Sequence, residues 1–195
     1  MVGKMGMSKY KIILSSNSPR RKELLQGLDL DFEVKVIPGI KESYPQNLLV
    51  EEIPQYIAAK KATAYHINKD ELVITADTIV VLDGLIMGKP KDEKDANNML
   101  HLLSGHTHQV ITGVCLTTVS QQKCFATCTE VTFKTLTDQE INYYVSNYHP
   151  LDKAGAYGIQ EWIGYIGVKS IKGSYFNVMG LPVQKIYEEI NKFVD

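Results

Sequence analysis

Two adjacent arginines that follow a hydroxyl-rich stretch are the first feature of the 195-residue sequence suited to chemistry. The residues at positions 15–21 read Ser-Ser-Asn-Ser-Pro-Arg-Arg. Ser18 followed by Pro19 is typical of a helix start, so Arg20 and Arg21 fall in the first helical turn. A helix N-terminus attracts anions, and arginine binds phosphate oxygens through paired hydrogen bonds. We expect a phosphate site here; the alternative is an ordinary capped helix with solvated arginines.

The second feature is a carboxylate between two apolar runs. Asp77 lies in the stretch Thr-Ala-Asp-Thr-Ile-Val-Val at positions 75–81. Buried acids are rare unless they are paired, bind a metal or act in catalysis. We therefore expect Asp77 to hold a hard divalent cation or to act as general base toward a water. The alternative is a turn-forming aspartate that caps local backbone N–H groups.

A lysine in a Gly-Lys-Pro motif is expected near this carboxylate. Asp83 followed by Gly84 predicts a tight β-hairpin, and close pairing about this turn places Lys89 beside Thr78. Lys89 and Asp77 would then lie at the same end of one hairpin. A cation there neutralises phosphate charge, and the alternative is a solvated lysine at a strand end.

A glycine-rich segment at positions 152–161 is the third feature. Closely spaced glycines let backbone approach a ligand, and the amide of Gln160 can read a nucleobase edge. The pattern differs from the dinucleotide and P-loop glycine motifs. Asp152 and Glu161 are interpreted as exposed loop residues rather than catalytic ones.

The cysteines predict neither zinc binding nor a disulfide framework. Cys115, Cys124 and Cys128 cannot all pair with one another, and their spacing with His106 and His108 does not match a zinc site. We expect free thiols and a cytoplasmic protein.

The elements that must position these residues alternate between strand and helix, which favours an α/β fold. Strands are predicted at residues 10–15, 32–37, 72–75, 79–82, 85–87, 108–119, 123–134 and 165–171. Helices are predicted at residues 20–28, 53–67, 92–103, 137–146 and 182–193. Thr137 and Glu140 form the pattern of a capping box.

Composition sets limits on function. The formal net charge is −1, which argues against the broad basic surface of a general nucleic-acid binder but leaves room for a local cluster of cations. No apolar run reaches the roughly 20 residues of a membrane span, and the start of the chain lacks the pattern of a signal peptide. We expect a single domain over residues 1–195.

Taken together, these motifs resemble the Maf family of nucleoside triphosphate pyrophosphatases, and the resemblance covers almost the whole chain. The matching segments lie at positions 16–25, 76–80, 88–90, 103–110, 152–160 and 173–182.

The resemblance implies an inosine-triphosphatase-like α/β fold, with a mixed twisted sheet flanked by helices and two lobes with a cleft between them. It implies hydrolysis of a nucleoside triphosphate between the α and β phosphates, with Asp77 as the proton acceptor. The residues expected to line the site are Ser16, Arg20, Arg21, Glu42, Lys61, Thr78, Lys89 and Gln160. Asp77, Lys89 and Glu42 are expected to serve catalysis, and Asp77 with Glu42 to bind Mg²⁺ or Mn²⁺.

Three positions resemble the branch of the family that prefers dTTP and UTP: Arg20, Thr78 and Gln160. A glutamine side chain both donates and accepts hydrogen bonds, which suits the carbonyl–N–H–carbonyl edge of thymine or uracil. The resemblance also implies a homodimer, and from the composition we expect no membrane partner and no stable nucleic-acid complex. The alternative function is a nucleotide- or nucleic-acid-binding regulator of septum formation that does not catalyse.

Overall fold

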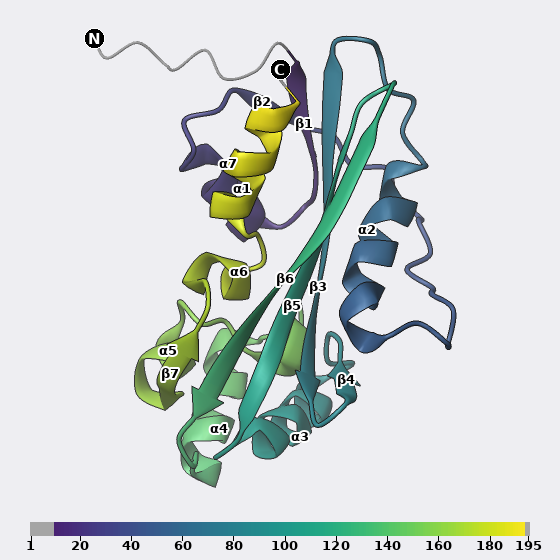
Figure 1. The fold of residues 1–195 in the computed structure, drawn as a ribbon. Helices are drawn as coiled ribbons and strands as arrows, with labels where there is room; N and C mark the ends of the chain where they lie inside the picture. The colour runs from purple at the N-terminus through teal and green to yellow at the C-terminus, as the bar shows by residue number, and fades with distance from the viewer. Residues whose placement is uncertain (1–9, 194–195) are drawn as a thin grey trace, which may run out of the picture. The chain divides into compact units, whose positions relative to one another are not determined.

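The computed structural model describes residues 10–193, and these form one mixed sheet of seven strands flanked by helices (Figure 1). The strands are β1 (Lys11–Ser15), β2 (Phe32–Val34), β3 (Glu71–Leu82), β4 (Leu85–Met87), β5 (Thr107–Thr117), β6 (Gln122–Phe133) and β7 (Val168–Lys172). The α-helices are α1 (Pro19–Gln26), α2 (Ile53–Ala62), α3 (Glu93–Leu103), α4 (Asp138–Tyr148), α5 (Trp162–Gly167), α6 (Tyr175–Met179) and α7 (Val183–Lys192). Two short 3₁₀ helices, η1 (Val50–Glu52) and η2 (Ala154–Ala156), complete the elements. The α/β class predicted from the order of elements is confirmed.

The strands follow the order β2-β1-β3-β5-β6-β7, and β4 pairs with β3. β1 is parallel to both β2 and β3, whereas the β3–β4 and β6–β7 pairs are antiparallel. Contacts divide the chain into two compact units, which we call unit 1 (1–77, 112–127 and 180–195) and unit 2 (78–111 and 128–179). β3, β5 and β6 each contribute residues to both units.

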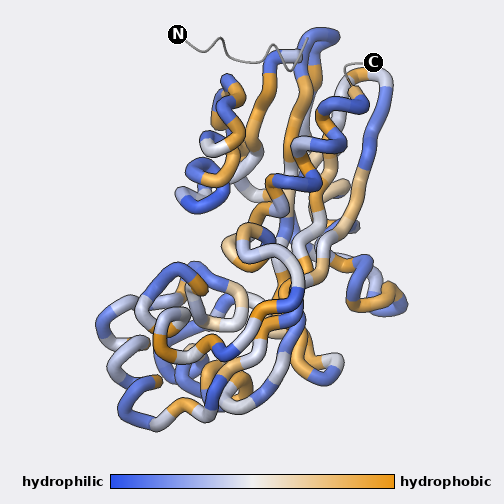
Figure 2. The backbone as a smooth tube through the Cα atoms, turned by 60° about the vertical axis from the view of Figure 1, so that its left-hand side comes forward, coloured by the Kyte–Doolittle hydropathy of each residue, from blue (hydrophilic) through white to orange (hydrophobic). Residues whose placement is uncertain are grey.

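Unit 1 surrounds the parallel strands with helices. α1 and α7 lie on one side of these strands and α2 lies on the other (Figure 1). β1 and the first half of β3 are buried on both faces, as expected for parallel strands covered on each side, and they stand out as hydrophobic orange runs in Figure 2. Leu14, Leu72 and Ile74 are completely inaccessible to solvent.

Unit 2 has a core of its own beneath α3, α4 and α5. Leu100, Phe133, Tyr144 and Ile163 are among its most deeply buried side chains. The predicted capping box at the start of α4 is confirmed, because the Thr137 hydroxyl accepts the backbone N–H of Glu140 and the Glu140 carboxylate accepts that of Thr137.

The two strands predicted at 72–75 and 79–82 are a single strand, β3. Asp77 lies in its middle, so it is not a turn residue as the alternative reading required. The predicted hairpin is confirmed: Leu82 pairs with Leu85, and both Asp83 and Gly84 have positive φ, as a tight two-residue turn requires.

Three predictions of secondary structure are wrong in their bounds, and one of them is the strand predicted over 32–37, which already ends at Val34. The helix predicted over 53–67 ends at Ala62, and Tyr65 is buried by tertiary contact instead: its hydroxyl donates to the Lys35 carbonyl and is hydrogen-bonded to the Ser15 hydroxyl. The strand predicted over 165–171 begins only at Val168, because α5 occupies residues 162–167. The short helix α6 was not predicted.

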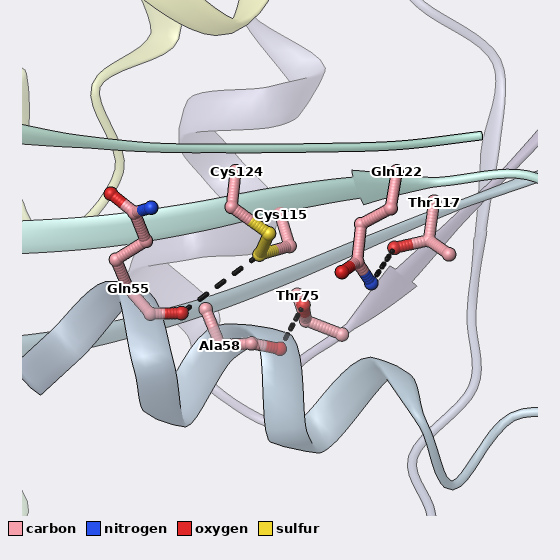
Figure 3. The surroundings of a disulfide bond; sticks show 7 residues. All are labelled: Gln55, Ala58, Thr75, Cys115, Thr117, Gln122 and Cys124. Atoms are coloured by element: carbon pink, nitrogen blue, oxygen red, sulfur yellow. Dashed lines mark hydrogen bonds between the residues drawn. A yellow bond between two sulfur atoms is a disulfide. The ribbon is translucent and has the colours of Figure 1, made fainter.

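The prediction of three free thiols is also wrong, since a disulfide joins Cys115 to Cys124 (Figure 3). The cause is the hairpin between β5 and β6, which places these two residues opposite each other with Cα atoms 4.1 Å apart. The Cys115 sulfur lies 3.9 Å from the Gln55 carbonyl oxygen of α2. Cys128 is exposed and takes no part in the disulfide.

No helix among residues 10–193 is long and apolar enough to span a membrane.

Candidate active site

An ammonium group held between two carboxylates is the centre of the candidate site in unit 1. Lys61 Nζ lies 2.8 Å from Asp77 Oδ1 and 2.8 Å from Glu42 Oε1. The side chains of Lys61 and Asp77 are each 14% exposed, while that of Glu42 is 55% exposed. Lys61 comes from the last turn of α2, Asp77 from the middle of β3 and Glu42 from the loop before η1. Three segments distant in sequence therefore meet at one cation.

The loop that carries Glu42 is fastened to α2 by a neighbouring pair of residues. Lys60 Nζ donates to the carbonyl oxygen and the hydroxyl of Ser43, at 3.0 and 2.7 Å. Consecutive lysines of α2 thus hold consecutive residues of the loop. This arrangement keeps the exposed Glu42 near the Lys61 ammonium.

Burial gives Asp77 the character of a stronger base. Loss of solvent around the carboxylate raises the pKa of Asp77 above its ordinary value, with the nearby Glu42 charge acting in the same direction. The Lys61 ammonium and the Arg21 guanidinium oppose this shift. A carboxylate with a raised pKa accepts a proton from water more readily than an exposed one does.

The Arg21 side chain is held by hydrogen bonds to two backbone carbonyls, one of which directly precedes Asp77. Its Nε donates to the Gly180 carbonyl at 2.8 Å, and its Nη1 donates to the Ala76 carbonyl at 2.9 Å. Burial lowers the pKa of Arg21, an effect that the Asp77 charge counters. Gly180 was not singled out in the sequence, although it lies in the matching segment 173–182. The guanidinium ties the C-terminal part of unit 1 to the peptide that precedes Asp77.

The start of α1 has the predicted form. The Ser18 hydroxyl accepts the backbone N–H of Arg21 at 3.4 Å, and the Ser16 hydroxyl accepts that of Ser18 at 3.1 Å. No acidic residue lies in the first turn of α1, so no carboxylate of that turn offsets the positive end of the helix. Because Ser15 pairs with Thr75 in the parallel register, Ser16 lies at the same edge as the peptide before Asp77.

The other three predicted site residues, Thr78, Lys89 and Gln160, belong to unit 2. Thr78 follows Asp77 in β3, and Lys89 is exposed just after β4. The Gln160 Oε1 atom is buried and has no hydrogen-bond partner in the part of the chain that the structure describes. A hydrogen bond from the Gly155 N–H to the Gly88 carbonyl, 3.1 Å long, joins the Gln160 loop to the segment that carries Lys89.

Within unit 1 the structure thus brings Ser16, Arg21, Glu42, Lys61 and Asp77 to one region, and Arg20 lies beside Arg21 in α1. Glu42 and Lys61 come from the least distinctive stretches of the sequence. Their place in the site had no signal in residue spacing and was implied only by the family resemblance.

Asp77 and Glu42 carry oxygen donors of the kind that bind divalent metals, and the Lys61 ammonium lies between them. Asp77 and Glu42 converge on one cationic centre, and carboxylate oxygens are the ligands that Mg²⁺ and Mn²⁺ prefer. Among residues 10–193 no cluster of three or more His, Cys, Asp or Glu side chains is suited to a metal. Two carboxylates suffice for Mg²⁺, which commonly completes its coordination with water and phosphate oxygens.

Comparison with known proteins identifies close relatives over nearly the whole chain. The family model described as Maf-like protein matches residues 11–193. A dTTP/UTP pyrophosphatase of Phocaeicola vulgatus is 65% identical over 188 residues, which cover 95% of this chain and 97% of the relative. A protein of the same name from Bacteroides fragilis is 59% identical over the same length, with the same coverage. One from Flavobacterium johnsoniae is 46% identical over 190 residues, covering 96% and 97%.

Proposed function

The chain belongs to the Maf-like protein family, and from this premise we propose that it hydrolyses dTTP and UTP to the monophosphate and pyrophosphate. The names of its relatives, which are 46–65% identical and match over 97% of their length, support this substrate class. The structural observation that carries the proposal is the buried pair of Asp77 and Lys61, with Glu42 on the same ammonium.

Asp77 activates the attacking water in this proposal. Its raised pKa favours proton acceptance, and its position in a buried strand holds the carboxylate in place. Lys61 and Arg21 keep positive charge beside it, and the family resemblance assigns Lys89 to catalysis as well. Cations placed where negative charge develops on phosphate oxygens lower the barrier to phosphoryl transfer.

The start of α1 binds the triphosphate. Arg20, the backbone N–H groups of the first turn and the Ser16 hydroxyl offer donors to phosphate oxygens. A Mg²⁺ or Mn²⁺ ion held by Asp77 and Glu42 would neutralise phosphate charge and lower the pKa of a bound water.

Base selection is assigned to Arg20, Thr78 and Gln160. A buried acceptor without a partner is costly, so the Gln160 Oε1 atom is suited to a donor supplied by a ligand. The N3–H group of thymine and uracil is such a donor, whereas N3 of cytosine is an acceptor. We further propose, from the resemblance, that the protein acts in the cytoplasm as a homodimer.

Release of pyrophosphate tests the function. The purified protein is incubated with dTTP, UTP, CTP, dGTP and 7-methyl-GTP, each with Mg²⁺ or Mn²⁺, and pyrophosphate is measured. We expect kcat/KM to be highest for dTTP and UTP. Higher efficiency with 7-methyl-GTP would overturn the substrate assignment, and nucleotide binding without any pyrophosphate would favour the non-catalytic regulator of septum formation.

A further inference from the structure

A buried tyrosine in α4 reaches the glycine-rich loop that carries Gln160. The Tyr144 hydroxyl donates to the Glu161 carboxylate and accepts the backbone N–H of Gly158, at 2.9 Å. Tyr144 is fully buried. One hydroxyl therefore holds the loop on both sides of Gln160, at positions 158 and 161.

Glu161 is engaged a second time by a buried cation. Lys153 Nζ lies 3.1 Å from Glu161 Oε1 and 2.7 Å from Asp152 Oδ1, and its side chain is only 9% exposed. A buried ammonium that loses its partner is strongly unfavourable, so this pairing resists rearrangement. The sequence reading of Glu161 as an exposed loop residue was wrong, because its partners come from α4 and from the far end of the loop.

The loop has little room to adopt another path. A Cβ added to Gly158 would lie 2.7 Å from Glu161 Cδ, and one added to Gly155 would lie 2.9 Å from a methyl carbon of Val80. Gly155 also has a φ of +69°, a conformation that L side chains rarely adopt. Steric contact and hydrogen bonding thus fix the same backbone conformation.

We propose that Tyr144, Glu161 and Lys153 are positioning residues that set nucleobase selectivity by fixing the orientation of Gln160. The inference rests on the proposed function, which assigns base recognition to Gln160. Gln160 precedes Glu161 directly, so any shift of the Glu161 backbone moves the buried Oε1 atom that awaits a donor. Burial and the bond to Glu161 raise the pKa of Tyr144, which keeps the phenol protonated as a donor.

The test compares the selectivity of variants rather than their activity alone. Tyr144→Phe removes one oxygen from a buried ring, and Glu161→Gln keeps the shape of the side chain while removing the charge that Lys153 pairs with. For each variant, kcat/KM is measured with dTTP and with CTP. We expect the ratio of dTTP to CTP to fall roughly ten-fold in both variants, because a site that reads a hydrogen-bonding edge loses discrimination when its acceptor moves.

A matched control separates positioning from simple loss of stability. Val145→Ala truncates a buried side chain of the same helix that takes part in none of these hydrogen bonds and ion pairs, and it should lower the melting temperature while leaving the dTTP:CTP ratio unchanged. A ratio equal to that of the wild type in Tyr144→Phe and Glu161→Gln, whatever their turnover, would overturn the inference.

Gln160→Ala distinguishes the failure of this inference from that of the proposed function. If Gln160→Ala collapses the ratio while the two positioning variants keep it, only the inference fails. If Gln160→Ala keeps the wild-type ratio, base recognition by Gln160 fails and the inference falls with it. Should the wild type release no pyrophosphate, the same ratios are measured as dissociation constants by calorimetry.

Discussion

At the scale of single residues, the Asp77–Lys61 pair combines two requirements that usually conflict. A carboxylate that serves as a base benefits from a raised pKa, and burial provides this for Asp77. An isolated buried charge would destabilise the fold, and the Lys61 ammonium at 2.8 Å offsets that cost. The ion pair thus stabilises a buried charge in the fold and also leaves Asp77 suited to act as a catalytic base.

Replacing Asp77 by Asn tests the catalytic part of this argument. The amide keeps the shape of the side chain and can still accept a hydrogen bond from Lys61, but it cannot take a proton from water. We expect kcat to fall by about 10²–10⁴-fold, the range typical of general base catalysis. Pyrophosphate release under saturating dTTP measures the effect.

The control Asp29→Asn alters an exposed residue with a φ of 54°, which asparagine adopts readily, and should leave kcat unchanged. Turnover of Asp77→Asn within a few-fold of the wild type would remove Asp77 from the mechanism.

The buried His108 makes stability depend on pH, because the folded chain favours its neutral form. Burial lowers the pKa of His108 to about 4, and its Nε2 is 2.8 Å from the Tyr157 hydroxyl. The unfolded chain binds a proton near pH 6.5, so the stability from neutral His108 is fully present above pH 6.5 and is lost as the pH falls towards 4.

We expect the wild type to lose about 2 kcal/mol of unfolding free energy through His108 between pH 6.5 and pH 5. Urea unfolding at the two pH values measures this loss. His108→Gln should show a correspondingly smaller loss because its side chain does not titrate, whereas the exposed His66→Gln should behave like the wild type. An equal pH dependence in His108→Gln would show that other groups cause it.

At the scale of secondary structure, the contact between α2 and β5 positions Lys61. Gly113 in β5 faces the first turn of α2, and a Cβ at this position would overlap backbone atoms of Pro54 and Gln55. Further along the helix, the Thr75 hydroxyl donates to the Ala58 carbonyl at 2.7 Å (Figure 3). The close packing of α2 against the sheet therefore requires a residue without a side chain at position 113.

Gly113→Ala should displace α2 and with it Lys61. Overpacking of a close contact costs about 1–3 kcal/mol, so we expect a lower melting temperature. Turnover per folded molecule should also fall, because the Lys61–Asp77 distance changes. Calorimetry and pyrophosphate release measure the two effects. For the stability measurement Gly88→Ala is the control, since its added Cβ meets no described atom within 4 Å. Normal stability in Gly113→Ala would contradict the close approach of α2.

Elements marked by contacts between near neighbours in sequence were predictable. Ser18-Pro19 at the start of α1, Asp83-Gly84 in the hairpin and the Thr137 capping box all act within a few residues. Features that depend on distant contacts were not predictable. The burial of Tyr65 suggested a longer helix, but Tyr65 lies beyond the end of α2 and is bonded through its hydroxyl to Ser15, 50 residues away.

The same division applies to the candidate site. Arg21 and Asp77 had local signals, whereas the carbonyl that Arg21 binds lies 159 positions away at Gly180. The disulfide of Cys115 depends on strand register, which cysteine spacing does not reveal. Residue types indicated the chemistry, and the fold decided which of them meet.

At the scale of the whole molecule, a net charge of −1 conceals a separation of charges. Many acids are paired locally, such as Glu189 with Lys185 and Lys192 in α7, and Glu140 with Lys134. The cations assigned to the triphosphate include Arg20 and Arg21, which lie together in a helical turn that contains no acidic residue. Attraction for anions is therefore local rather than spread over the surface.

This distribution predicts that salt strongly lowers the efficiency with which the protein uses its nucleotide substrate. It also predicts little affinity for nucleic acid. We expect kcat/KM for dTTP to fall steadily between 0.05 and 0.5 M NaCl, because screening shortens the range of the local cations. Inhibition by dTMP, which carries less charge, should weaken less over the same range. At 0.15 M NaCl the protein at micromolar concentration should not retard duplex DNA in a gel, since such binding needs many simultaneous phosphate contacts that a few clustered cations do not supply. Retardation of DNA under these conditions would contradict the local character of the positive charge. It would favour the nucleic-acid-binding regulator over the pyrophosphatase.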